Sequence, residues 1–343
     1  MATDSPTVDT PAPRSSFSLR ALRYRTGPLL RRTGRLVVTL VLVTFLTTLM
    51  LDLLPGDPAV AIAGGDTFRV SEALINRIRS ELGLDKSIPE RYATWVGNAL
   101  SGDLGTSYRT RQPVLDLILP RIPVTIEVML LAQFFALGFA LILAPIAALF
   151  QGRAFDRAVS TVSFALVSVP TFISAIVLIQ IFAVQLGVLP STGYTPIGQG
   201  IIPSLKSVLL PSMALAAAEA GIFTRVLRAG MVASLDEDYT MMARAKGLST
   251  PVVVARHALR PASLPLLTLI GLSTGALIGG AVITETIFAL PGIGRLVVDS
   301  INTRDLITVQ AVVALVAVSY VVINYLVDIA YLVADPRIRH GES

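Results

Sequence analysis

Acidic residues within apolar segments are the side chains of this sequence best placed to do chemistry. The chain has no Cys and only two His, both in polar stretches, so the sequence predicts no thiol nucleophile, no disulfide and no metal site. Nothing in it predicts a catalytic residue. A carboxylate in hydrocarbon is costly and is by default a functional candidate. Five acids lie in apolar segments: Asp52, Glu127, Glu219, Glu285 and Asp328.

Glu219 lies deepest within its segment, MALAAAEAGIFTRVL. We interpret it as a candidate for lining a transport pathway, where it could meet an ammonium group. The alternative is a pairing with a neighbouring helix or with Arg225, the one Lys or Arg inside the apolar segments. Glu285, near the end of another segment, is the second pathway candidate, with a solvated or loop-pairing role as its alternative.

A nucleotide-binding loop is absent from the sequence. The P-loop pattern G-x-x-x-x-G-K-[ST] needs a Gly before its Lys. The three Lys of the chain follow Asp85, Leu205 and Ala245 instead. The chain therefore cannot bind ATP in this way, and any transport it performs is driven by another chain or by a coupled gradient.

The composition, 53% hydrophobic and 15% charged, is typical of a membrane protein. A membrane-spanning helix needs roughly 20 apolar residues. We predict an all-α integral membrane protein with six transmembrane helices. The first segment has full span length and no small-residue cleavage site, so we interpret it as a retained helix and not a signal peptide. The six segments are 36–54, 122–150, 160–186, 208–227, 262–290 and 306–334.

Charge predicts the orientation of these helices. Of the 28 Lys and Arg, 17 fall in segments 1–35, 151–159, 225–261 and 335–343. By the positive-inside rule these segments, including both termini, are cytoplasmic. We interpret the basic residues of the partly disordered N-terminal tail as a signal that fixes the topology, with contact to anionic lipid as the alternative.

Two stretches outside the spans carry predicted helices of their own. Residues 55–121 form a predicted extracytoplasmic insert between the first two helices, in which Ser71 begins one helix and Ser87 a second. In the cytoplasm, residues 234–261 lie between helices four and five. Residues 122–334 then make up the transmembrane domain, with helices two to six.

The cytoplasmic stretch contains DYTMMARAKGLST and has the pattern of two short helices. Ser234 and Glu237 fit a capping box that would start a helix over 235–246. Gly247 follows as the residue able to take positive φ at the helix end. Thr250 then begins a second helix, PVVVARHALR.

Such a helix–Gly–helix segment has three interpretations. A DNA-binding helix-turn-helix is disfavoured because the segment is tied to the bilayer at both ends, so we expect no nucleic-acid partner. An amphipathic linker in the headgroup region is possible. The third interpretation is a surface presented to a cytoplasmic partner, which the small residues Ala243, Ala245 and Gly247 favour because they permit close approach.

The stretch YTMMARAKGLSTPVVVARHALRPASLP resembles the cytoplasmic coupling loop of type I ABC importer permeases. Within them it resembles the B-type subunit of oligopeptide, dipeptide and nickel permeases. The resemblance extends over about 300 of the 343 residues. Met241-Met242-Ala243 depart from the Glu-Ala-Ala that begins the general pattern. Further agreeing stretches are RIPVTIEVMLLA, VPTFISAIVL, LPSTGY, ETIFALPGIGRLVVDSINTRD and NYLVDIAYLVADPRIR.

The resemblance implies a permease subunit of the bacterial cytoplasmic membrane that imports short peptides by alternating access. It implies a second homologous permease, two ATPase subunits or domains that bind ATP and Mg, and an extracytoplasmic solute-binding protein docked on 55–121 and 286–305. Nickel chelates, glutathione or another small solute are alternative cargoes. A stand-alone secondary transporter is the alternative from another class. The residues implied to dock on the ATPase are Tyr239, Met242, Ala243, Ala245, Lys246, Gly247 and Leu248.

The fifth predicted span has glycines at four-residue spacing: Gly271, Gly275 and Gly279. Small residues on one helix face let another helix approach closely. We interpret them as a helix-packing face, within the chain or against a second permease.

Overall fold

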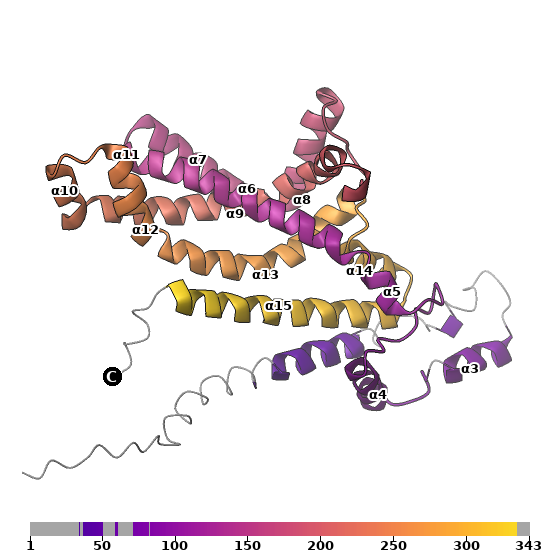
Figure 1. The fold of residues 1–343 in the computed structure, drawn as a ribbon. Helices are drawn as coiled ribbons and strands as arrows, with labels where there is room; N and C mark the ends of the chain where they lie inside the picture. The colour runs from indigo at the N-terminus through magenta and orange to yellow at the C-terminus, as the bar shows by residue number, and fades with distance from the viewer. Residues whose placement is uncertain (1–33, 35–36, 51–58, 61–70, 82, 335–343) are drawn as a thin grey trace, which may run out of the picture.

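The computed structural model describes residues 34, 37–50, 59–60, 71–81 and 83–334 (Figure 1). Throughout these residues the secondary structure is helical, with one isolated β-bridge between Thr106 and Pro113. Four of the shorter helices are α3 (Glu72–Glu81), α4 (Ile88–Leu100), α5 (Val114–Ile118) and α14 (Ile293–Asn302). The long ones are α6 (Ile122–Leu149), α9 (Ile201–Leu235), α13 (Leu264–Ile287) and α15 (Leu306–Ala334).

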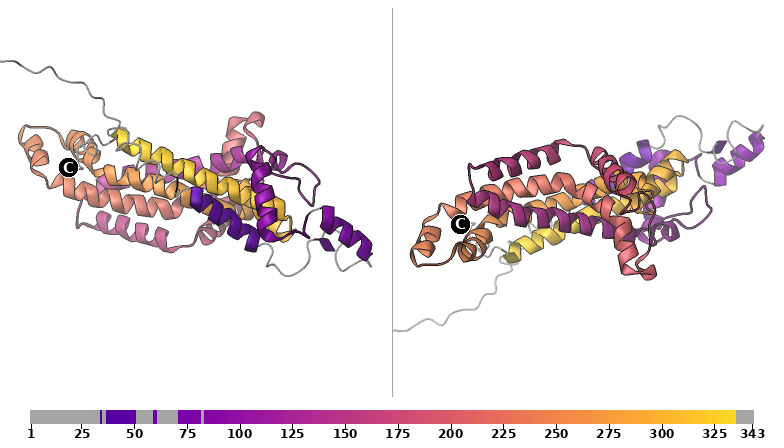
Figure 2. Two further views of the ribbon diagram at one scale, coloured as in Figure 1. Left: turned by 90° about the horizontal axis from the view of Figure 1, so that it is seen from below. Right: turned by 90° about the horizontal axis from the view of Figure 1, so that it is seen from above.

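Four stretches of the described chain are long and apolar enough to cross a membrane: Val114–Leu149, Ile201–Leu235, Leu264–Ile287 and Leu306–Leu326. The predicted first span is represented by the apolar helix Val37–Met50, and the rest of that prediction lies outside the described residues. Figure 2 shows this helix beside α15.

The third predicted span, 160–186, is not one straight helix. It is divided into α7 (Ala154–Ser168) and a second piece, α8 (Thr171–Leu178) continued by the π-helical η2 (Ile179–Gln185). The two pieces meet at 108°. The cause is Pro170, because a proline disfavours helical geometry at the residue before it, and Val169 is extended with ψ 121°.

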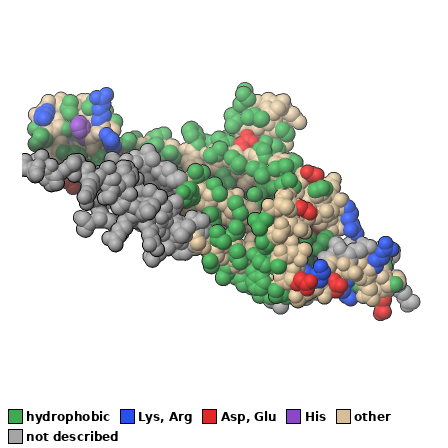
Figure 3. Space-filling model, turned by 60° about the horizontal axis from the view of Figure 1, so that its bottom comes forward, with side chains coloured by type: hydrophobic (Ala, Val, Ile, Leu, Met, Phe, Trp, Pro, Cys, Tyr) green, Lys and Arg blue, Asp and Glu red, His purple; other side chains and the backbone are tan. Residues whose placement is uncertain are grey.

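The long helices have two ends that differ in what they carry. At one end, here the α10 end, lie α10 (Asp238–Ala245), α11 (Thr250–Val252), η4 (Val253–Ala258) and α12 (Leu259–Ala262). At the other, the α14 end, lie α14 and the insert helices (Figure 1). Figure 3 shows apolar side chains over the middle of one face and charged side chains at these two ends.

The core is a close contact between α6 and α9. Residues four apart share a helix face, and one face of α6 carries small residues at this spacing over its whole length. Such residues bring two helices close together inside a membrane. The α6 stripe is Val124, Val128, Ala132, Ala136, Ala140, Ala144 and Ala148, each at most 5% exposed. The buried small residues of α9 include Ser204, Val208, Ser212, Ala216 and Ala220.

Helix α9 is the centre of the fold, in contact with α6, α7, α8, α12 and α13. At a rise of about 1.5 Å per residue its 35 residues extend roughly 52 Å, beyond the ~30 Å of hydrocarbon. Two glycines of α9 allow neighbouring helices to pack closely against it. A Cβ at Gly221 would lie 2.5 Å from the Ser163 carbonyl of α7, and one at Gly230 would lie 3.0 Å from the Ala262 carbonyl of α12.

Both predicted insert helices are present. α3 follows Ser71, and α4 begins after its N-cap Ser87. Tyr92 attaches α4 to the helix Val37–Met50: its hydroxyl lies 2.7 Å from the Thr44 hydroxyl and donates to the Val41 carbonyl at 3.1 Å.

Candidate functional site

The α10 segment is a short surface helix attached to the end of α9. Its N-cap is Glu237, which makes no side-chain capping bond. The predicted capping box with Ser234 is therefore wrong, because α9 continues through Leu235 and includes Ser234. Instead, the buried Thr240 hydroxyl donates to the Ser234 carbonyl at 2.7 Å, which fixes α10 to the end of α9.

Gly247 ends this helix as predicted. Its φ is +81°, and its N–H donates to the Arg244 carbonyl at 2.9 Å. The N–H of Leu248 donates to the Ala243 carbonyl at 3.3 Å. These two bonds form a Schellman motif. No atom lies within 4 Å of a Cβ built at Gly247, so conformation and not crowding inside this chain requires the glycine.

Several large apolar side chains of the segment are exposed. Tyr239, Met242 and Leu248 are 43%, 59% and 40% exposed. Large apolar side chains gathered on a polar helix indicate a protein contact, and Met adapts well to a partner surface. Six of the seven residues implied to dock are on the surface, the other three being Ala245, Lys246 and Gly247. Ala243 is 5% exposed and packs inward, so it supports the segment from below.

The second half of the segment is packed against α9. Its first helix, α11, has Ser249 as its N-cap, one residue before the predicted N-cap Thr250. Val253, Ala258 and Ala262 are buried. Since Ala262 lies directly over Gly230, the return to α13 is held close to α9.

An ion pair braces α9 against α7 at the same end. The Asp156 carboxylate is 3% exposed and accepts from Arg228 Nε, from Arg228 Nη2 at 2.6 Å and from the Gly152 N–H at 2.9 Å. Arg225 lies over the Phe164 ring of α7, 4.0 Å from its centroid. This stacking directs Arg225 to α7, and no ion pair joins it to Glu219 among the described residues.

Glu219 lies in the wall of a groove of about 390 Å³ between α9 and α13. The residue is 7% exposed, and its Oε2 atom is buried without a hydrogen-bond partner in the described part of the chain. Ser273 of α13 and Thr171 of α8 line the same groove. The structure thus places this predicted pathway residue on a cavity wall.

Glu285, the second pathway candidate, has no exposed surface and holds three helices together at the α14 end. Its Oε1 accepts from the Thr125 hydroxyl of α6 at 2.6 Å, and its Oε2 from the Arg295 N–H of α14 at 3.1 Å. Thr125 Oγ1 in turn accepts from the Ile293 N–H at 2.9 Å. Carboxylate and hydroxyl thereby satisfy the free N–H groups at the α14 N-terminus, where negative charge is favourable.

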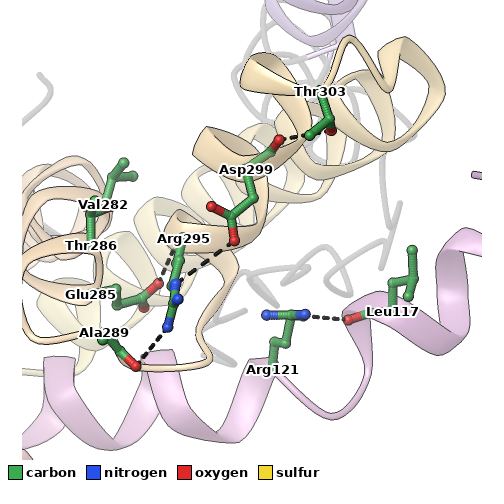
Figure 4. Close-up of polar contacts among 9 residues, drawn as sticks. All are labelled: Leu117, Arg121, Val282, Glu285, Thr286, Ala289, Arg295, Asp299 and Thr303. Carbon is green, nitrogen blue, oxygen red and sulfur yellow. Dashed lines mark hydrogen bonds and ion pairs between the residues drawn. The ribbon is translucent and has the colours of Figure 1, made fainter. Parts of the chain in front are cut away.

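The loop around Glu285 is shaped to fit the carboxylate. A Cβ at Gly292 would overlap the carboxyl group, so any larger residue there would displace the carboxylate from its hydrogen bonds. Figure 4 shows Arg295 reaching back to the Ala289 carbonyl, at 2.7 Å, and toward Asp299. Neither a solvated position nor a free pathway position describes Glu285 in this structure.

The glycines of α13 have separate surroundings. A Cβ at Gly275 would overlap the Tyr320 ring, so α15 packs closely there. Gly279 has no atom within 4 Å of such a Cβ, and its neighbour Gly280 meets Leu215 of α9. Gly271 is buried. The predicted single packing face is therefore divided between two neighbours and open space.

A second anchor at the α14 end was not found from the sequence. Asp305, before α15, accepts from the Ser107 hydroxyl, from the Tyr108 N–H at 3.1 Å and from the Thr308 hydroxyl at 2.7 Å. Burial raises the pKa of Tyr108 to about 12, although the Arg91 charge acts in the opposite direction. No local pattern marks this contact, because its partners are 198 positions apart.

Among the described residues, no group of three or more His, Cys, Asp or Glu is arranged to hold a metal ion. The polar features described above are of three kinds: hydrogen-bonded contacts between helices, the groove that Glu219 lines, and the exposed helix that ends at Gly247.

Comparisons with known proteins agree with this arrangement of a helical membrane chain. Residues 136–340 match the family model for the binding-protein-dependent transport system inner membrane component, and residues 26–129 match the N-terminal model of such membrane components. A probable peptide ABC transporter permease of Sinorhizobium fredii is 40% identical over 312 residues, which cover 91% of this chain and 99% of the relative.

Two further relatives differ in the cargo that their names state. A di/tripeptide transport system permease of Pseudomonas aeruginosa is 40% identical over 330 residues, covering 90% of this chain and 98% of the relative. A glutathione transport system permease of Escherichia coli is 38% identical over 311 residues, covering 91% and 98%.

Proposed function

The chain belongs to the family of binding-protein-dependent transport system inner membrane components, and on that premise we propose that it is one permease half of an ATP-driven importer of short peptides. It is a multi-pass protein of the inner membrane and a permease without an ATPase site of its own. The observation that carries the proposal is the exposed α10–Gly247 surface, because a chain without a P-loop needs a contact through which ATP hydrolysis elsewhere can act on it.

The proposed complex contains a second homologous permease, two ATPase subunits that bind ATP and Mg, and an extracytoplasmic binding protein. The ATPase would contact the α10 end through Tyr239, Met242 and Leu248. The binding protein would dock at the α14 end, on the insert and the segment 286–305. This arrangement of partners requires the α10 end to be cytoplasmic, in keeping with the Lys and Arg content of that end. The proposed topology then has six transmembrane helices and both termini in the cytoplasm.

Short peptides are the cargo we favour over other small solutes. Two of the relatives described above are named for peptide or di/tripeptide transport, and glutathione, named in the third, is itself a modified tripeptide. The transport step is a change between inward- and outward-facing states. Movement of α10 would reach the membrane through Thr240 and Ser234, which fix it to α9.

Reconstitution tests this function directly. The affinity-tagged chain is purified in mild detergent with its co-purifying subunits, inserted into vesicles with ATP inside, and given a radiolabelled tripeptide with the binding protein outside. We expect uptake that needs internal ATP and stops with a non-hydrolysable analogue. Uptake that persists without ATP and follows an ion gradient would instead establish a secondary transporter. ATP-dependent uptake of glutathione without uptake of the tripeptide would make glutathione, and not short peptides in general, the cargo.

Orientation is tested separately, with the advantage that the chain has no Cys of its own. A single Cys replacing the exposed Ser249 should react with a membrane-impermeant maleimide in inside-out vesicles only. Labelling from the outside of intact cells would contradict the proposed topology.

A further inference from the structure

The Glu219 carboxylate lies in a largely apolar groove, where Ser273 of α13 is its polar neighbour. It lies on α9 between Leu215 and Phe223, in a groove whose other wall is α13. Residue Glu219 is 7% exposed, and its Oε2 has no hydrogen-bond partner among the described residues. Groove walls that include Leu269 and Leu272 are apolar.

Two other acids of the long helices, Glu127 and Glu285, have hydrogen-bond partners on their carboxylate oxygens, and this sets Glu219 apart. Glu127 accepts from the Tyr194 hydroxyl at 3.0 Å and from the Ser204 hydroxyl at 3.1 Å. Glu285 accepts from Thr125 and from the Arg295 N–H. A structural role of this kind for Glu219 would need donors that the described chain does not place on Oε2.

No cation of the described chain neutralises Glu219. The groove is lined by neither Lys nor Arg. The nearest arginines along α9 are occupied elsewhere, Arg225 by the Phe164 ring and Arg228 by Asp156. An unpaired carboxylate in an apolar membrane site is energetically costly and is by default a candidate binding group.

The chemistry of the groove selects the kind of cation. One carboxylate cannot supply the six to eight oxygen ligands of Ca²⁺, and no other acid lines the groove. A primary ammonium group needs only a few acceptors, which one carboxylate oxygen and the nearby hydroxyls of Ser273 and Thr171 provide. The volume of about 390 Å³ is large enough to hold an amino-acid residue along with its ammonium group.

We propose that Glu219, with Ser273 opposite, binds the ammonium group of the cargo as it passes between α9 and α13. This inference rests on the proposed peptide-import function and adds to it one specificity-determining site. It implies that the permease itself, and not only a binding protein, distinguishes cargo with a free amino group from cargo without one.

The experiment compares two cargoes in the reconstituted complex. Vesicles contain wild-type chain, Glu219→Gln or the matched control Glu127→Gln, each with ATP inside. The probes are a neutral tripeptide and its N-acetylated form, supplied on the binding protein, with loading measured so that uptake is expressed per loaded molecule. Glu127→Gln is a suitable control because glutamine can still accept from Tyr194 and hydrogen-bond with Ser204.

We expect Glu219→Gln to lower uptake of the free-amine tripeptide about tenfold or more, the size expected for losing a charged hydrogen bond. Uptake of the acetylated form should change less than twofold, and Glu127→Gln should leave both uptakes near wild type. Equal losses for the two cargoes, or no loss for either, would overturn the inference. If wild type fails to import peptides at all, the proposed function fails first, and the two failures are thus distinguishable.

A milder variant covers the case in which Glu219→Gln is not recovered as a folded complex. Ser273→Ala removes one hydroxyl from the groove and leaves the carboxylate in place. It should lower free-amine uptake selectively by about two- to fivefold. A Ser273→Ala complex that folds and shows the wild-type ratio between the two cargoes would contradict the site.

Discussion

The Asp305 carboxylate, at the start of α15, accepts a hydrogen bond from the hydroxyl of Ser107, 198 positions earlier in the chain. Both residues are at most 4% exposed. Through this contact the loop that follows α4 is fastened to the corner between α14 and α15. A site for a docking protein on the insert would therefore be mechanically continuous with the transmembrane helices.

Asp305→Ala should release the insert loop while the long helices stay folded. The change leaves the Ser107 hydroxyl and the Tyr108 N–H without their acceptor, at a cost of about 2–4 kcal/mol for a buried charged group. Limited proteolysis should cut the loop around Arg109 and Arg111 several times faster. Asp299→Ala is the control, because that acid is exposed and its pairing with Arg295 spans 3.7 Å. Equal cleavage of both variants would show that Asp305 does not hold the loop.

Gly247→Trp should block transport and leave the chain inserted. The side chain would stand on the surface that we assign to the ATPase, and its φ of +81° adds roughly 1–2 kcal/mol of strain for any non-glycine residue. Gly247→Ala carries the same strain without the bulk, so it is the matched control. ATPase activity stimulated by the loaded binding protein should fall to background for Trp and only partly for Ala. Full activity of the Trp variant would refute docking at this position.

Alanine substitutions at three glycines should differ in their cost to stability according to the atoms that the new Cβ would meet. Gly221→Ala meets the backbone carbonyl of Ser163, which cannot move aside, and should cost about 2–3 kcal/mol. Gly275→Ala meets the ring of Tyr320, which can rotate, and should cost about 1 kcal/mol. Gly279→Ala has open space and should be neutral or slightly stabilising. Size-exclusion chromatography after heating gives the order, and a different order would mean that α9 and α13 pack in another way.

Glu285→Ala should destabilise the α14 end. It removes the acceptor of the Thr125 hydroxyl and of the Arg295 N–H, which we expect to cost about 2–4 kcal/mol. Glu285→Gln keeps one accepting oxygen and should lose less. Thr286→Ala, one residue along α13, is the control, because that hydroxyl is exposed and donates only to Val282 of its own helix (Figure 4). A drop in melting temperature that is as large for Thr286→Ala would remove the special role of Glu285.

The sequence predicts the features that depend on a few neighbouring residues. The positive φ at Gly247 is one of these, because a Schellman motif is built within six residues. The start of α4 after Ser87 is another. The break at Val169 was also accessible, since Pro170 restricts the residue before it, but the length of the apolar segment outweighed this signal. At Ser234 a local pattern misled, because the packing of α9 extends the helix through an apparent capping box.

Features that depend on distant residues could not be predicted in the same way. Glu285 meets Thr125 across 160 positions, and its spacing in the sequence says nothing about that contact. Glycine spacing on α13 predicted a shared face, whereas Gly275 and Gly280 meet different helices. The alanine repeat of α6 was visible in the sequence, but only the structure shows that α9 is the helix that it faces.

Helix α9 also has the dimensions of a lever. Pro211 cannot donate a backbone hydrogen bond, so a bend of α9 would be easiest there, and the proline would then be the pivot of the helix. Glu219 follows it by 8 residues and Leu235 by 24, so the two arms measure roughly 12 and 36 Å. A stroke of about 6 Å delivered at Leu235 would then move the Glu219 carboxylate by about 2 Å. On the proposed function, a large displacement at the α10 end would therefore produce a small and finely adjusted displacement of the groove wall.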